Sequence, residues 1–107
     1  MSDNLSPLTH LQFAILDVMG TDSVSGKAIR KALAAEHNIK KSGPSFYQLM
    51  ARLEEAKFVE GWYEQQVIDG QIIKERNYKI VGKGTSAMKQ TKAFYLGRTG
   101  GSRPALA

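Results

Sequence analysis

Hydrophobic residues recur with a helical period in the first half of the chain, beginning just after Pro7. Thr9 and Gln12 have the spacing of a capping box, in which two side chains satisfy N–H groups at the start of a helix. Gly20 is a typical helix stop. Apolar residues cover nearly two sides of this helix, so both sides must be buried. These residues are Leu11, Phe13, Ala14, Ile15, Leu16, Val18 and Met19.

Two further amphipathic helices are predicted between Ser25 and Lys57. Ser25 is placed to cap a helix over residues 26–36, which ends near His37. Pro44 suits the first turn of the third helix, because its missing N–H would be unpaired there anyway. The predicted buried stripe of the third helix is Phe46, Leu49, Met50, Leu53 and Ala56.

From Val59 onward the apolar period changes from helical to alternating. Residues 59–68 and 71–80 are rich in β-forming side chains and flank Asp69-Gly70, a strong signal for a two-residue hairpin turn. Polar and apolar residues mix on both faces of the second strand. The pattern therefore predicts an exposed two-stranded ribbon and not a central strand of a sheet.

Three helices followed by a ribbon is the element order of a winged helix-turn-helix, in which the ribbon is the wing. Residues 42–59 are more specific, because they resemble the recognition-helix signature of PadR-like transcriptional regulators. That signature combines a small-residue turn, an apolar–tyrosine pair, a leucine, an Arg-Leu-Glu triplet and an exit into the wing. The matching residues here are Ser42-Gly43, Phe46-Tyr47, Leu49 and Arg52-Leu53-Glu54.

The resemblance continues on both sides of the third helix. Residues 75–84 are similar to the family's wing end, with a basic residue, a tyrosine, an apolar residue and a closing glycine. Residues 8–16 resemble its first helix. Over about residues 5–96 the resemblance implies an α+β, mostly helical winged helix-turn-helix with three helices, a two-stranded β wing and a short C-terminal helix.

The resemblance also implies a sequence-specific, double-stranded DNA-binding transcriptional regulator, most simply a repressor. As a homodimer it would place two recognition helices in successive major grooves. The alternative is a winged-helix protein–protein interaction module without specific DNA binding, because a fold does not determine a function. One positive surface shared by the third helix and the wing would favour DNA, whereas positive charge confined to the tail would favour the interaction module.

Glycine-rich breaks suggest the domain layout. Gly82-Lys83-Gly84 predicts the end of the DNA-binding domain, which spans residues 9–84 and follows an extended arm over residues 1–8. A short fourth helix is predicted over residues 85–96, and a disordered tail over residues 97–107. Family members carry a longer C-terminal helix, so a short one predicts a modest dimer interface and gives no support to a small-molecule effector.

Charge is distributed unevenly along the 107-residue chain, which has 15 basic residues, 10 acidic residues and a net charge of +5. Every acidic residue lies at or before Glu75, and from Arg76 onward all charged residues are basic. A basic end suggests a polyanionic partner such as nucleic acid. Charge alone is equally compatible with a solvated tail.

Composition argues against several other functions. The chain has no cysteine, which excludes disulfides and thiolate metal sites. No apolar run approaches the ~20 residues of a membrane span, and the N-terminus does not resemble a signal peptide, so we expect a cytoplasmic protein without a membrane partner. His10 and His37 lack further ligands at metal-binding spacing. No nucleophile–base arrangement is visible, so we expect no metal, no cofactor and no enzymatic activity.

The third helix carries the side chains best suited to reading DNA. Ser45, Gln48 and Arg52 lie along one side, away from the apolar stripe, and these residue types pair with base edges or phosphates. Cations before this helix and on the wing are placed to meet phosphates. An ordinary solvated face is the alternative, and wing charges also protect edge strands from aggregation. The candidate DNA-binding residues are Lys40, Lys41, Ser42, Ser45, Tyr47, Gln48, Arg52, Lys74 and Arg76.

Dimerisation is expected through the first and fourth helices, because each has more apolar residues than one stripe requires. Alternatively, the two helices pack on each other within a single chain. The candidate interface residues are Leu11, Phe13, Leu16, Met88, Phe94 and Tyr95.

Overall fold

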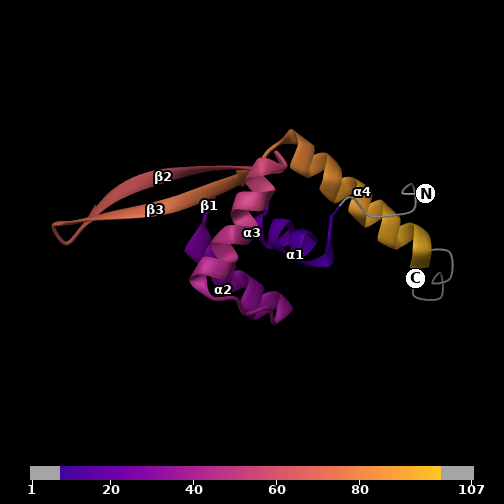
Figure 1. Ribbon diagram of the computed structural model, residues 1–107, viewed down its shortest axis with the longest axis horizontal. Helices are drawn as coiled ribbons and strands as arrows, with labels where there is room; N and C mark the ends of the chain where they lie inside the picture. The colour runs from indigo at the N-terminus through magenta and orange to yellow at the C-terminus, as the bar shows by residue number, and fades with distance from the viewer. Residues whose placement is uncertain (1–7, 100–107) are drawn as a thin grey trace.

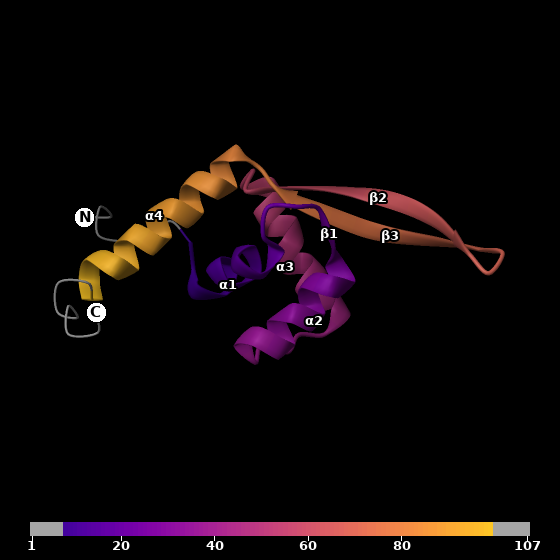
Figure 2. The ribbon, with the colours of Figure 1, turned by 180° about the vertical axis from the view of Figure 1, so that it is seen from behind.

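The computed structural model describes residues 8–99, which form a winged helix-turn-helix with an additional C-terminal helix (Figure 1). The predicted fold class is thereby confirmed. The ribbon β2–β3 projects from one side of the three-helix body, and α4 leaves from the other side, as the view from behind also shows (Figure 2). The elements are α1 (His10–Met19), β1 (Val24–Ser25), α2 (Gly26–His37), α3 (Gly43–Glu55), β2 (Val59–Ile68), β3 (Gln71–Ile80) and α4 (Gly82–Thr99).

Side-chain caps fix where the first helices begin. The Thr9 hydroxyl accepts a hydrogen bond from the Gln12 N–H at 3.1 Å, and the Thr9 N–H donates to Gln12 Oε1 at 3.0 Å, which confirms the capping box. The Ser25 hydroxyl caps α2 as predicted, by accepting from the Ala28 N–H at 3.1 Å. The Ser42 hydroxyl, predicted only as a DNA contact, also has a structural role. It accepts from the N–H at position 45 and caps α3.

The sheet contains a strand that sequence reasoning missed. Its order is β1-β3-β2, and the two-residue β1 pairs with β3 through Val24–Tyr78 and Ser25–Asn77. The sequence predicts a linker at residues 21–24, because two residues are too few to show an alternating pattern. The strand ties the start of α2 to the base of the wing and so helps to fix the position of the wing relative to the helices.

The hydrophobic core lies between the three helices and the base of the wing. The predicted stripe of each helix supplies it, and Tyr78 of β3 closes it on the wing side with only 2% of its surface exposed. Hydrophobic residues with 1% exposure or less come from α1, α2 and α3. These are Ala14, Ile15, Leu16, Ile29, Leu33, Phe46, Met50 and Leu53.

The fourth helix differs from its prediction at both ends. It begins at Gly82, and the N–H of Thr85 donates to the carbonyl of Val81 at 2.9 Å, so the Gly-Lys-Gly segment is helical instead of a break. Gly84 packs directly against the backbone of Phe58, because a Cβ at this position would overlap the carbonyl oxygen of Phe58. The helix continues to Thr99, so residues 97–99 are not part of a tail. Residues 100–107 and residues 1–7 of the predicted arm lie outside the described residues.

A stripe of small residues brings α4 close to the body. Gly84, Ala87 and Thr91 are buried on one side of the helix, and α4 packs against α1. None of the helices described here has both the length and the hydrophobicity needed to cross a membrane.

Candidate nucleic-acid interface

The side of α3 that faces away from the core carries the predicted base-reading residues. Gln48 and Arg52 are exposed, and Ser45 is half-buried near the N-terminus of the helix. Phe46, on the opposite side of α3, is fully buried. The core contacts of α3 therefore leave the Gln48–Arg52 edge available to a ligand.

Tyr47 lies at the boundary between the core and this edge. Its ring meets the Phe46 ring edge-on, with 5.0 Å between the ring centroids, and lies against Gly26 at the start of α2. The side chain remains 39% exposed. Tyr47 is thus a packed ring at the surface, as a phosphate-contacting tyrosine requires.

A groove beside α2 gathers five cations and no acidic side chain. It has a volume of about 320 Å³ and includes Ala34 in its wall. Arg30 is held in place, because its Nη2 donates to the carbonyl of Lys41 at 3.0 Å and so ties α2 to the α2–α3 turn. The five cations, which we call the α2 cluster, are Lys27, Arg30, Lys31, Lys40 and Lys41.

Sequence reasoning found only two of the five residues of the α2 cluster, Lys40 and Lys41. Lys27, Arg30 and Lys31 follow i, i+3, i+4 spacing, which places them on one face of a helix. This spacing is the sequence signal from which these three residues could have been found. It shows that these residues lie off the apolar stripe, but it does not show which solvated face lies next to the α2–α3 turn.

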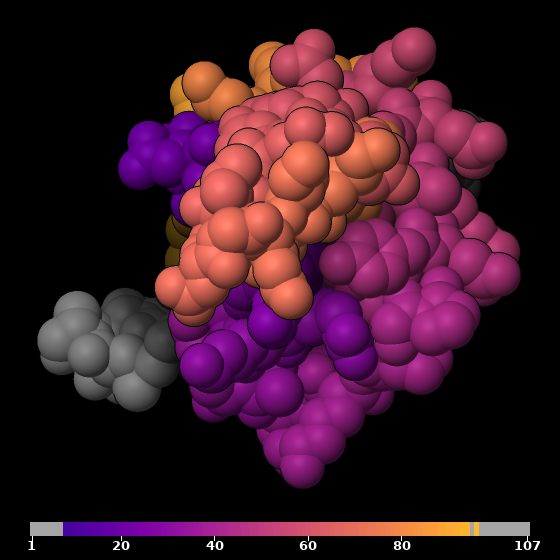
Figure 3. Space-filling view, turned by 90° about the vertical axis from the view of Figure 1, so that its left-hand side faces the viewer, coloured from indigo at the N-terminus to yellow at the C-terminus, as the bar shows by residue number. Residues whose placement is uncertain are grey.

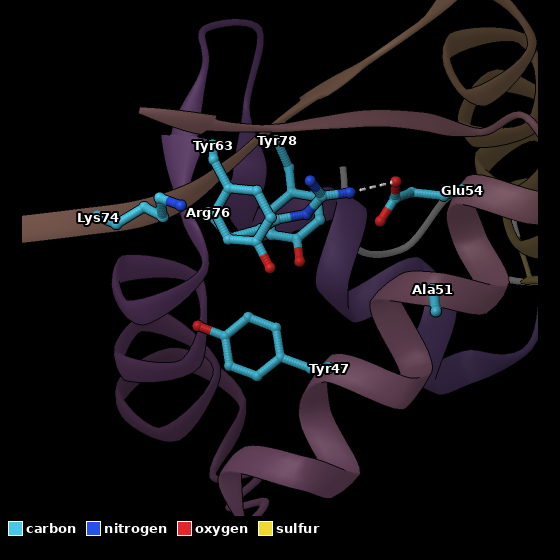
Figure 4. A pocket seen from close by; sticks show the side chains of 7 residues that line it. All are labelled: Tyr47, Ala51, Glu54, Tyr63, Lys74, Arg76 and Tyr78. Atoms are coloured by element: carbon cyan, nitrogen blue, oxygen red, sulfur yellow. Dashed lines mark hydrogen bonds and ion pairs between the residues drawn. The ribbon is translucent and has the colours of Figure 1, made fainter. Parts of the chain in front are cut away.

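A second cavity, of about 520 Å³, lies between α3 and the wing (Figure 4). Its walls carry three tyrosines, whose hydroxyl groups lie around the same space: Tyr63 and Tyr78 reach down from the wing and Tyr47 stands opposite them (Figure 4). Lys74 and Arg76 lie on the wing side of this cavity, and the Arg76 side chain extends across to α3.

Arg76 makes an ion pair that its predicted role did not include. Its Nη2 lies 2.7 Å from Glu54 Oε1, and both side chains are about one-quarter exposed, at 25% and 27%. The guanidinium also lies over the Tyr63 ring, 4.8 Å from the centroid. A Cβ at Gly61 would come within 2.9 Å of Arg76 Nη2, so the glycine leaves room for this crossing.

The surroundings of the ion pair shift the pKa of Arg76 and of Tyr78. Burial is the largest influence on the pKa of Arg76 and lowers it, but the interactions with Glu54 and Tyr78 together leave that pKa above its usual value. Burial is also the main reason why the pKa of the Tyr78 hydroxyl is raised. Arg76 therefore braces the wing against α3, and Glu54 offsets much of its charge. Lys74 is exposed, with its ammonium 5.6 Å from the centre of the Tyr63 ring.

The two faces of the wing have opposite electrostatic character. Cross-strand register places Tyr63 opposite Arg76 and Gln65 opposite Lys74, on a face that has no acidic residue from Gly61 to Val67 or from Ile72 to Tyr78. We call this the basic face. The other face carries Glu60, Glu64 and Glu75 together with Lys79, and the Trp62 Nε1–H donates to Glu64 Oε2 at 2.9 Å.

The basic face and the α2 cluster belong to one surface. Lys27 lines the groove beside α2 and also a groove of about 260 Å³ at the edge of β3, whose other walls are Tyr47, Ile73, Lys74, Glu75 and Arg76. In the view along the wing, α2 and α3 lie directly below and beside the wing (Figure 3). Basic side chains therefore follow one another from the α2–α3 turn across α2 to the wing, with Glu75 as the acidic side chain of the connecting groove.

Cations from the basic end of the sequence lie mostly elsewhere. Lys83 stands over the Phe58 ring, with 5.6 Å to the centroid. Lys89 and Lys92 line a groove of about 340 Å³ between α1 and α4. The side chain of Arg98 and the whole of Arg103 lie outside the described residues. The charge asymmetry along the chain therefore does not locate the positive surface.

The predicted dimer residues divide into different environments. Leu16 is only 1% exposed and belongs to the chain's own core, so it has no surface for a partner and its assignment to the interface is corrected. Leu11, Phe13 and Met88 are half-buried against that core, and Phe94 is half-buried. The side chain of Tyr95 lies outside the described residues. Leu96, absent from the prediction, is 63% exposed.

The histidines are not brought together. His37 Nε2 lies 3.3 Å from Asp17 Oδ2 and links α2 to α1, whereas His10 is exposed on the first turn of α1. Within residues 8–99 the structure has no group of three or more histidine, cysteine or acidic side chains that could hold a metal ion.

Comparison with known proteins places this arrangement among PadR-type folds. The sequence matches no protein-family model and no curated protein sequence. Among solved structures, a PadR family transcription regulator from Clostridium difficile is similar with a TM-score of 0.74 and 15% identity, over 92% of this chain and 100% of that chain. A PadR-like transcriptional regulator from Bacillus cereus has a TM-score of 0.68 and 23% identity, over 90% and 89% of the two chains.

PadR of Bacillus subtilis, solved in complex with operator DNA, is also similar, with a TM-score of 0.62 and 19% identity. The match covers 78% of this chain and 46% of that chain, so this chain corresponds to about half of that protein. The likeness shows that the chain has the winged helix-turn-helix fold found in these regulators.

Proposed function

We propose that this chain is a PadR-like transcriptional regulator that binds double-stranded DNA in a sequence-specific manner. The observation that carries the proposal is that the α2 cluster and the basic face of the wing are joined through Lys27 and lie beside α3, whose Gln48–Arg52 edge is exposed. Duplex DNA is a regular polyanion, and proteins bind it by neutralising phosphates with lysine and arginine. The positive charge of this surface is opposite in sign to that of the duplex, as binding requires.

The exposed edge of α3 supports a role in reading the major groove. Arginine can donate two hydrogen bonds to guanine, and glutamine can pair with adenine in the same way, so Arg52 and Gln48 have the chemistry of direct readout. At the N-terminus of α3 the N–H groups of Ser45 and Phe46 already donate to Ser42, so the serine hydroxyls of Ser42 and Ser45 are the donors offered to a phosphate. Lys40, Lys41 and Lys74 flank this helix and would fix its register on the sugar–phosphate backbone.

The electrostatics also favour DNA over the protein-interaction alternative. Glu54 is the acidic residue of α3 closest to the wing, and its carboxylate is paired with Arg76 instead of facing solvent alone. Positive charge is found on α2, on the α2–α3 turn and on the wing, which is the distribution that a DNA-binding surface requires. We propose that the regulator acts on DNA in the cytoplasm and that its occupancy of a promoter represses transcription.

Arg52→Ala tests the reading function of α3. On a duplex selected from random sequence with the wild-type protein, we expect Arg52→Ala to weaken binding by about 1–3 kcal/mol, with a much smaller loss on unrelated DNA. Lys57→Ala is the matched control, because it removes one exposed positive charge just beyond the end of α3. Equal losses on both DNAs would make Arg52 a phosphate contact, and failure to select any preferred duplex would contradict sequence-specific binding.

We also propose a homodimer that uses α4. The helix leaves the body, and its buried stripe faces α1 while Leu96 is 63% exposed near its far end. Covering that leucine would remove apolar surface from water. Leu96→Glu should lower the sedimenting mass at micromolar protein, whereas Gln90→Glu, at an exposed position on another side of α4, should not. A wild-type protein that sediments as a monomer at all concentrations would contradict the dimer.

A further inference from the structure

The tip of the wing is apolar, which a phosphate-contacting ribbon does not require. Four β-branched hydrophobic residues surround the Asp69-Gly70 turn. Val67 and Ile72 are cross-strand partners and are 72% and 70% exposed, more than the 47% and 37% of Ile68 and Ile73. Large apolar side chains this exposed, at the end of a projecting ribbon, indicate a contact surface.

The most exposed pair lies on the basic face of the wing. Strand alternation puts Val67 and Ile72 on the same face as Lys74 and Arg76, which has no acidic residue over its length. Ile68 and Ile73 share the other face with Glu64 and Glu75. A polyanion would therefore be attracted to the Val67–Ile72 face and repelled from the opposite one.

The ribbon is long enough to reach past the site of α3. β1 pairs with β3 only at Asn77 and Tyr78, and Arg76 holds the wing to α3; from there to the turn at Asp69 the two strands pair only with each other. At ~3.3 Å per residue this free part extends roughly 20 Å. A half turn of B-DNA separates the centres of a major groove and the adjacent minor groove by about 17 Å. With α3 in the major groove, the tip can therefore reach the neighbouring minor groove.

We infer that Val67 and Ile72 enter the minor groove beside the α3 site and favour A·T pairs there. This inference rests on the proposed DNA-binding function. The 2-amino group of guanine projects into the minor groove, and A·T pairs have only acceptors at that edge. Methyl groups of valine and isoleucine cannot accept a hydrogen bond, so they would bury the guanine donor unpaired. The wing tip is thus a source of sequence preference in addition to a phosphate contact.

Inosine provides a direct probe, because an I·C pair lacks the 2-amino group and otherwise keeps the major-groove edge of G·C. In a duplex selected with the wild-type protein, each flanking pair is set in turn to A·T, G·C or I·C. At the pairs under the tip we expect A·T and I·C to bind about fivefold tighter than G·C, since an unpaired buried donor costs about 1 kcal/mol or more.

Threonine variants assign the effect to the tip. Val67→Thr with Ile72→Thr keeps the β-branched shape and adds hydroxyl acceptors for guanine, so the preference against G·C should fall below twofold. Ile68→Thr with Ile73→Thr makes the same change on the other face and should keep the preference. A wild type that treats G·C and I·C alike, or a Val67/Ile72 variant that keeps the full preference, would overturn the inference while leaving DNA binding intact.

Two further outcomes would also overturn the inference that Val67 and Ile72 enter the minor groove. If no duplex is selected at all, both the proposed function and this inference fail. If the Val67/Ile72 variant sediments at a lower mass than the wild type without DNA, the tip binds a second copy of the chain instead of the minor groove.

Discussion

Replacing Lys27, Lys31 and Lys40 together by glutamine should lower the salt dependence of DNA binding by about 2.7 units, or about 0.9 for each phosphate that is no longer neutralised. The three lysines are exposed in the groove beside α2, and Arg30 is kept because it holds the α2–α3 turn. At physiological salt this corresponds to roughly 100-fold weaker binding to any duplex. The slope of log affinity against log salt concentration is the measurement.

A second triple variant separates location from net charge. Lys79, Lys89 and Lys92 are also exposed, but Lys79 lies on the wing face opposite the basic face and the other two lie on α4. Replacing these three by glutamine removes the same charge and should change the slope by less than about one unit. Similar slopes for the two triple variants would mean that DNA binding depends on overall charge and not on the α2 cluster.

Gly84→Ala should destabilise the fold by about 2–3 kcal/mol, because the added methyl group would overlap the backbone oxygen of Phe58 and force α4 away from the body. Denaturant unfolding measures this as a lower midpoint. A backbone oxygen cannot move aside as the end of a flexible side chain can, so little relief is available. Thr91 and Ala87, further along the same stripe, would lose packing as the helix shifts.

Gly82→Ala is the control, two residues earlier in the same helix. A Cβ at Gly82 meets no atom within 4 Å, and alanine is the better helix former, so this variant should be more stable by up to about 1 kcal/mol. Opposite signs for the two substitutions would confirm that the glycines have different roles. Equal effects would contradict the close crossing of α4 over Phe58.

The secondary structure could be predicted largely because its signals are local. Thr9 and Ser25 cap helices through contacts three residues away, Gly20 ends α1 with a positive φ of 70°, and Asp69-Gly70 closes a hairpin between adjacent strands. The strand β1 and the role of Gly84 depend on partners far along the chain, at Tyr78 and Phe58. The sequence predicts a flexible break at Gly82 and Gly84, and only the fold shows that Gly84 packs against the backbone of Phe58.

The candidate site could be predicted only in part, for the same reason. The Gln48–Arg52 edge follows from the periodicity of a single helix. The α2 cluster joins the α2 cations to the turn beyond, and it lies within residues 1–75, which contain every acidic residue. Charge counted along the chain indicates the C-terminal cations instead. The ion pair of Arg76 could not be predicted either, because its partner Glu54 lies on another element.

Amide chemical-shift mapping on the isotope-labelled protein, titrated with a selected duplex, tests the DNA-binding surface most directly. The account predicts the largest shifts at Gln48 and Arg52 of α3, in the α2 cluster, and on the wing at Lys74, Val67 and Ile72. Amides of α4 beyond Ala87 should shift little. Shifts confined to α4, or a surface that does not change when the duplex is added, would contradict the proposal that this chain is a DNA-binding regulator.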